Sequence, residues 1–263
     1  MTHPAAFVLV VSMLLTGGAT APDRAEQQAT VSRPDSEVLI GLSSTDEQLL
    51  EAVQRGDLAG VEAALRQGAD VDAGDGYRGY GVAIATAQGN RQILQQLVSA
   101  GANVNVIGTD GQTPLGKAVE MGNPELVAIL VNAGANPNVT PAYSPSPLYR
   151  ATETGNVEIV RLLVQAEANP NVLSGGMTPL YRAVETGNGV LARLLLSGGA
   201  NPNQLAQGVA PLARAVEAGN VELVQLLLGY GADPQTRLRG RSVLAIAQEQ
   251  GNTTIVTLLR QAQ

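Results

Sequence analysis

The stretch Thr178-Pro179-Leu180-Tyr181-Arg182-Ala183-Val184-Glu185-Thr186-Gly187-Asn188 decides the fold, because its pattern recurs on both sides at a nearly fixed interval. Its closing glycine, followed by Asn or once by Asp, recurs with spacings of 33, 33, 33, 32, 32 and 32 residues at Gly56, Gly89, Gly122, Gly155, Gly187, Gly219 and Gly251. A second marker, Gly-Ala, follows twelve residues later at Gly68, Gly101, Gly134, Gly199 and Gly231, and the remaining copy reads Glu167-Ala168. Two markers that keep one period indicate repeats of one structural unit.

Each repeat predicts two helices joined by a tight turn. Thr113, Ser146 and Thr178 each precede a proline, which places an N-cap hydroxyl before a residue suited to the first helical turn. The central glycine is suited to end this first helix in a left-handed conformation, and the Asn after it is suited to cap the second. Helices of about eight to ten residues are marginal in isolation, so neighbouring repeats must bury one another's apolar faces.

A T-P-L-x-x-A opening, a central Gly and a closing G-A-[DN]-x-N at this period closely resemble the ankyrin repeat. The resemblance runs from Thr45 to the C-terminus and implies an all-α solenoid of about seven helix-turn-helix repeats with β-turn finger loops. Thr45 is the expected first N-cap, with Gln48 completing a capping box. We expect a single repeat domain over residues 45–263, divided at 45–74, 75–107, 108–140, 141–172, 173–204, 205–236 and 237–263.

The N-terminal segment predicts export. Ala5 to Leu15 form an apolar run of eleven residues without charge, and small residues follow, so residues 1–21 are interpreted as a signal peptide cleaved after Ala19 or Ala21. The absence of Lys and Arg before this run departs from the usual pattern, and a hydrophobic tail that stays on the chain is the alternative.

Residues 22–44 are polar and are expected to form a disordered linker. With no later apolar run long enough for a membrane span, the expected location is exported, periplasmic or secreted.

Composition narrows the classes of function. With 16 Lys and Arg against 23 Asp and Glu, the net charge is -7, which argues against nucleic acid as a partner. There is no Cys, and the only His is His3, within the predicted signal peptide. A mature chain without His or Cys cannot build a Ser-His-Asp triad, a Cys-His pair or a Cys/His zinc site. We therefore expect a protein that is not an enzyme and that holds no metal or cofactor.

Aligned repeats also reveal two charged columns. A basic residue stands five positions before the central glycine, and an acidic residue stands two positions before it. The basic column is Lys117, Arg150, Arg182 and Arg214, and the acidic column is Glu120, Glu153, Glu185 and Glu217. The columns share one side of the first helix, which in ankyrin proteins lines the concave groove. Either the charges pair with one another as a solvated ladder, or they recognise a partner.

The few aromatic residues gather in the same part of each repeat. Tyr77 and Tyr143 fall in finger loops, and Tyr149 and Tyr181 take the register where ankyrin repeats usually have the His of T-P-L-H. Met177 and Val209 share one finger column. Such amphipathic residues are enriched at interface centres. The alternative for Tyr149 and Tyr181 is structural, because they can fill the space that the His would occupy.

The function these features favour is that of a non-enzymatic protein-protein interaction module. The expected surface is the concave groove with the finger loops, formed by Tyr77, Tyr143, Tyr149, Arg150, Glu153, Met177, Tyr181, Arg182, Glu185, Val209, Arg214 and Glu217. The chain is expected to be a monomer that binds a protein partner, whose identity the sequence does not give. The alternative is an exported immunity or inhibitor protein that blocks a toxin or an enzyme.

Overall fold

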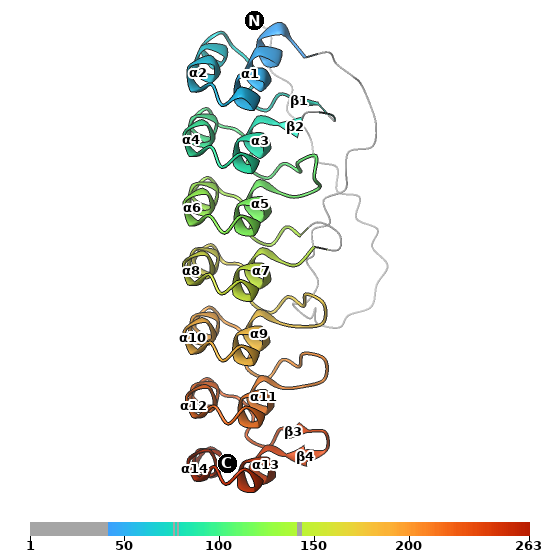
Figure 1. The fold of residues 1–263 in the computed structure, drawn as a ribbon, viewed down its shortest axis with the longest axis vertical. Coiled ribbons are helices and arrows are strands. Elements are labelled where there is room, and N and C mark those ends of the chain that lie inside the picture. The colour runs from blue at the N-terminus through green and yellow to red at the C-terminus, as the bar shows by residue number, and fades with distance from the viewer. Residues whose placement is uncertain (1–41, 76, 78, 141–143) are drawn as a thin grey trace, which may run out of the picture. The chain divides into compact units, whose positions relative to one another are not determined.

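The computed structural model describes residues 42–75, 77, 79–140 and 144–263. The predicted signal peptide, most of the predicted linker and Tyr143 lie outside these residues. Within them the chain forms fourteen α-helices in seven consecutive pairs, which confirms the predicted helical solenoid (Figure 1). The first helices of the pairs are α1 (Ser44–Arg55), α3 (Gly81–Ala87), α5 (Pro114–Glu120), α7 (Pro147–Glu153), α9 (Pro179–Glu185), α11 (Pro211–Glu217) and α13 (Val243–Glu249). The second helices are α2 (Leu58–Arg66), α4 (Arg91–Ser99), α6 (Pro124–Asn132), α8 (Val157–Gln165), α10 (Gly189–Ser197), α12 (Val221–Gly229) and α14 (Thr253–Gln261).

Within the repeat stack the first helices form a column between the second helices and the fingers (Figure 1). Each first helix contacts the second helix of its own repeat and the first helix of the next. Two fingers are antiparallel hairpins, one of β1 (Gly74–Asp75) with β2 (Gly79–Tyr80) and one of β3 (Arg237–Leu238) with β4 (Arg241–Ser242). In the fifth and sixth repeats a single bridge closes the finger, Ser174 with Met177 and Ala206 with Val209.

The predicted caps are confirmed. The hydroxyls of Thr113, Ser146 and Thr178 accept hydrogen bonds of 3.0 to 3.2 Å from the backbone amide three residues on. The six Asn residues after the central glycines cap the second helices in the same way, at 3.0 to 3.2 Å. The central glycines have φ between 65° and 75°, the left-handed region in which a Cβ is strained. The turn between the two helices is therefore specified from both ends.

The predicted cap of the first helix is wrong by two residues. Ser43, not Thr45, is the N-cap, and Asp46 rather than Gln48 completes the capping box, with its carboxylate accepting the Ser43 amide at 3.0 Å. Asp46 also accepts the Asp70 amide at 2.8 Å. Hydrogen bonds from the Ser43 hydroxyl, and then from the Asp70 and Ser43 amides, lower the pKa of Asp46 below 3.8. Its carboxylate thus links α1 to the first inter-repeat loop.

The core lies between the two columns of helices. The repeated small residues Ala118, Ala151, Ala183 and Ala215 are fully buried, as expected where adjacent first helices approach closely. The second helices supply branched residues such as Leu195, which is 0 % exposed. Thr253, Thr254, Thr257, Arg260 and Gln261 are exposed on the last helix and give it the predicted polar outer face.

A ladder of Asn and Asp side chains ties each repeat to the next. In the first five closing motifs the second polar side chain accepts a backbone amide of the following repeat at 2.7 to 2.8 Å. The accepting residues are Asp72, Asn105, Asn138, Asn171 and Asn203. The four Asn residues also donate from Nδ2 to a carbonyl of that repeat, at 2.9 to 3.3 Å. These bonds set the spacing of the stack on the side of the loops.

Candidate functional site: the ladder face

The charged columns form ion pairs along the first helices. Within each repeat the basic side chain bonds the acid three residues on, with N to O distances of 3.1 Å for Lys117 with Glu120, 3.0 Å for Arg150 with Glu153, 2.8 Å for Arg182 with Glu185 and 2.8 Å for Arg214 with Glu217. We call the surface formed by these eight residues the ladder face. Both members of the central pair keep more than a quarter of their side chains exposed, 29 % for Arg182 and 28 % for Glu185.

The pairs also reach between repeats at the C-terminal end of the ladder face. Arg214 lies 3.6 Å from Glu185 of the preceding repeat, and Arg239 of the last finger lies 3.8 Å from Glu217. The basic row ends at the second and seventh repeats, where Ile84 and Ile246 stand in its register. The charges pair with one another, as the ladder alternative expects. The paired groups also remain accessible, so recognition of a partner stays a prediction.

Tyr149 and Tyr181 lie behind this surface. Their side chains are only 4 % and 7 % exposed, and burial raises the pKa of both phenols. The Tyr149 hydroxyl donates to Sδ of Met177 at 4.0 Å, which links the fourth repeat to the next finger. This burial favours the structural alternative for the two tyrosines, since a partner would reach only the edges of their rings. Their role in binding stays a prediction.

The finger residues lie in different environments. Tyr77 is 92 % exposed, whereas Met177 and Val209 are half-buried beside their bridges. Val209 packs against the core as well. The structure thus brings the Arg and Glu columns together with Met177 and Val209, but it leaves Tyr77 at the tip of a separate finger.

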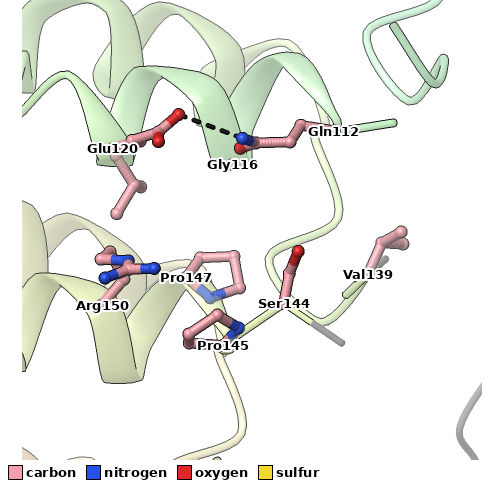
Figure 2. Close-up of a pocket in the computed structure, with 9 residues that line it drawn as sticks. Gln112, Gly116, Glu120, Val139, Ser144, Pro145, Pro147 and Arg150 are labelled. Carbon is pink, nitrogen blue, oxygen red and sulfur yellow. Dashed lines mark hydrogen bonds between the residues drawn. The ribbon is translucent and has the colours of Figure 1, made fainter. Parts of the chain in front are cut away.

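Sequence reasoning missed a slot in front of Gly116, between the third and fourth repeats. Figure 2 shows Gln112 and Glu120 on one side, joined by a hydrogen bond of 3.0 Å, and Pro147 and Arg150 on the other. Val139, Ser144 and Pro145 border the slot, whose volume is about 50 Å³. Hydrogen bonds from Lys117 and Gln112 lower the pKa of Glu120, so its carboxylate stays charged at neutral pH. The sequence could have indicated this slot, because Gly116 stands in the aligned column that holds Tyr149 in the next repeat.

In residues 42–75, 77, 79–140 and 144–263, no three Asp or Glu side chains gather in a way that would hold a metal ion. Within the same ranges, no helix is long and apolar enough to cross a membrane. The groups that the ladder face offers are three guanidinium groups, one ammonium group and four carboxylates, which suit the reversible recognition of polar groups on another molecule.

Stacked helix pairs, capped alike and tied by one polar ladder, define a helical repeat protein. The family model for ankyrin repeats in three copies matches residues 49–141, 139–206 and 190–263, and the chain belongs to the ankyrin repeat family. No curated protein sequence matches the chain significantly.

Solved structures agree with this assignment. The chain is similar to an ankyrin repeat domain from Acinetobacter baumannii AYE, with 32 % identity, a TM-score of 0.63 and coverage of 70 % of this chain and 98 % of that one. It is similar to the ankyrin repeat domain of Bcl-3, an IκB family member, with 26 % identity, a TM-score of 0.64 and coverage of 81 % and 97 %. The human ASB11 ankyrin repeat domain matches with 27 % identity, a TM-score of 0.57 and coverage of 82 % and 97 %. Ankyrin repeat domains generally serve as protein-interaction modules and are typically non-enzymatic scaffolds.

Proposed function

We propose that this chain is a non-enzymatic binding module that takes a protein partner along the ladder face and the adjoining fingers. The observation that carries the proposal is the run of four ion pairs with the same orientation on four successive first helices. Neither capping, nor the turns, nor the core requires these charges. Exposed pairs of this kind contribute only about 0.3 to 0.5 kcal/mol to stability, so stability alone gives little reason for a complete row.

The fingers extend this surface with apolar contact area. Met177 and Val209 are half-buried next to the rows, so they can be covered without a large change in conformation. A partner lying across the fourth to sixth repeats would meet charged pairs on one side and apolar finger residues on the other. Apolar contact area bordered by polar groups is common in protein-protein interfaces.

Two further expectations concern where the module works and its oligomeric state. We infer that the module works outside the cytoplasm, in a periplasm or the medium, because residues 1–21 have the pattern of a signal peptide. We also infer a monomer, for which light scattering should give a mass near that of one chain, 27.1 kDa less any segment removed. The same surface would serve an immunity or inhibitor protein, in which case the partner is a toxin or an enzyme.

A site-specific cross-linker tests the proposed surface. A photoreactive amino acid is placed at Met177 beside the ladder face, or at the exposed Arg161 of α8 as the control, and the protein is irradiated in envelope extract. We expect a discrete adduct from the Met177 position and none from the Arg161 position. Adducts from Arg161 alone would place the binding surface on the second helices.

Matched double variants test the charged rows themselves. Arg182→Ala with Arg214→Ala removes two guanidinium groups from the ladder face, and Arg161→Ala with Arg193→Ala removes two from the second helices. Truncating an interface Arg commonly costs about 2 kcal/mol, so the first pair should reduce the Met177 adduct at least tenfold. The second pair should leave it unchanged, and circular dichroism should report the same helix content for both. Equal adduct yields from the two pairs would contradict the proposal.

A further inference from the structure

The slot at Gly116 is one copy of a site that the chain fills itself in the next two repeats. Gly116 occupies the register of Tyr149 and Tyr181, three residues after the N-cap in each repeat. In the later two repeats a phenol ring enters the space between successive repeats and is almost completely buried. In the third repeat no side chain of the described residues enters, and the space remains as the pocket of Figure 2.

The walls of the slot match those around Tyr149. Glu120 and Arg150 border the slot, and in the next repeat Glu153 and Arg182 stand in the same two registers. The charges of Glu153 and Arg182 act on the Tyr149 phenol, so the ring lies within their reach. Pro147 at the slot is repeated as Pro179.

The residue facing the ring completes the match. Pro145 borders the slot in the register of Met177, whose sulfur accepts the Tyr149 hydroxyl. The space in front of Gly116 is therefore built from the types of groups that surround a tyrosine ring elsewhere in this chain. The neighbouring hollow at Ala83 is different, because Ala87 stands there in place of the acid.

The slot has room for more than one bound water. Its volume is about 50 Å³, whereas a single water needs a cavity of roughly 10 to 15 Å³. The part of the slot's border next to Gly116 is the side chain of Gln112, which bonds Glu120. This side chain is flexible, so it can move aside when the slot is filled. A Cβ at Gly116 would lie 3.2 Å from the Thr113 hydroxyl, a close contact, yet Ala245 carries a Cβ in the same register beside the capping hydroxyl of Ser242.

We propose that the slot at Gly116 binds a tyrosine side chain of the protein partner, with the ring between Gly116 and Pro147 and the hydroxyl toward the charged side chains of Glu120 and Arg150. The proposal rests on the ladder face being the partner's docking surface, and it names the anchor that this surface accepts. The slot would make the third repeat the fixed point of the complex, because the corresponding spaces in the fourth and fifth repeats are already filled.

Two variants of Gly116 test whether the slot can hold a phenol ring. Gly116→Tyr copies the following two repeats, and Gly116→Ala copies the sixth and seventh and controls for the higher helix propensity of a residue with a Cβ. If the slot receives the ring, Gly116→Tyr should melt at a higher temperature than Gly116→Ala. A melting temperature equal to or below that of Gly116→Ala would overturn the proposal.

Titration with p-cresol, the side-chain analogue of tyrosine, tests the open slot directly. In the full chain, p-cresol should shift the amide resonance of Val119 saturably, and Arg161→Ala should keep the dissociation constant within twofold. Gly116→Tyr should weaken this binding at least tenfold, because its own ring occupies the slot. Unchanged p-cresol binding in Gly116→Tyr, or no saturable shift in the unaltered chain, would overturn the assignment.

The two proposals fail in different ways. If p-cresol binds at the slot but the Arg182→Ala, Arg214→Ala variant keeps the full Met177 adduct, the slot is real and the ladder face is not the docking surface. If that variant loses the adduct but Gly116→Tyr keeps it, the docking surface is supported and the tyrosine anchor is refuted.

Discussion

Replacing Asn171 by Ala should weaken the stack at one defined interface. The Asn171 side chain accepts the Asn201 amide at 2.8 Å and donates to the Gly199 carbonyl at 3.2 Å, both in the next repeat. Its own amide bonds the Asn169 side chain at 3.0 Å within the same loop. The change to Ala therefore removes two bonds between repeats and leaves the local loop bond in place.

The expected loss of stability follows from these two hydrogen bonds. A net contribution of about 0.5 to 1.5 kcal/mol each gives a loss of about 1 to 3 kcal/mol in the free energy of unfolding. Asn169→Ala is the matched control, because its side chain accepts one bond, from Asn171 in the same repeat, and is exposed. The control should cost only about 0.5 to 1 kcal/mol, since water can replace the lost acceptor.

Urea denaturation followed by circular dichroism at equilibrium measures both variants. Because a repeat protein is stabilised by each interface separately, a weakened interface should also broaden the transition and lower its m-value as the two flanking segments begin to unfold separately. Loss of stability that is equal in Asn171→Ala and Asn169→Ala, with unchanged m-values, would refute the idea that the polar ladder couples the repeats.

Three further substitutions and one mass measurement test the core, the turns, the first cap and export. Leu195→Ala, at a fully buried position of α10, should cost about 2 to 5 kcal/mol in urea denaturation. Glu167→Gly should stabilise the chain by roughly 1 kcal/mol in the same assay, because Glu167 has φ 59° where the other repeats have Gly. Because the pKa of Asp46 is lower in the folded state than its unfolded value of 3.8, the charged carboxylate stabilises the fold above pH 3.8. This contribution is lost as the pH falls through the lower folded pKa. Asp46→Asn should therefore reduce the loss of stability on acidification below pH 3.8, measured by urea denaturation. Mass spectrometry of the native protein should find a start near Thr20 or Pro22, and an intact Met1 would contradict export.

The sequence predicts this fold well because its signals are local. Proline at the first helical turn, glycine in the left-handed turn and Asn at the next cap each act within a few residues, and the structure confirms them. The error at the first helix has the same origin. Ser43, Ser44 and Thr45 all carry a hydroxyl suited to an N-cap, and the choice of Ser43 depends on Asp46, which also bonds the distant Asp70 amide.

The candidate site is predicted less completely because it depends on contacts between repeats. Aligned columns showed that Arg182 and Glu185 share a side of one helix, but not that Tyr149 of the preceding repeat is buried behind them. A tyrosine in a loop and a tyrosine between two helices look alike in a single repeat. The slot at Gly116 is harder still to foresee, since it is defined by a side chain that the third repeat lacks.

Positions that break the repeat pattern can fix the register in which a partner binds. Rows of identical ion pairs would let a partner bind equally well after a shift by one repeat, because each repeat would present the same Arg and Glu. The chain departs from regularity at both ends of the ladder face, with Ile84 and Ile246 in the basic column, and at Gly116 within it. A partner that engages the charged pairs and also inserts a ring at Gly116 loses its anchor after a shift of one or two repeats toward the C-terminus, since Tyr149 and Tyr181 fill the next two slots. After a shift of one repeat toward the N-terminus the ring would meet the hollow at Ala83, where Ala87 stands in place of the acid. The regular columns would then contribute attraction, and the slot at Gly116 would determine the register.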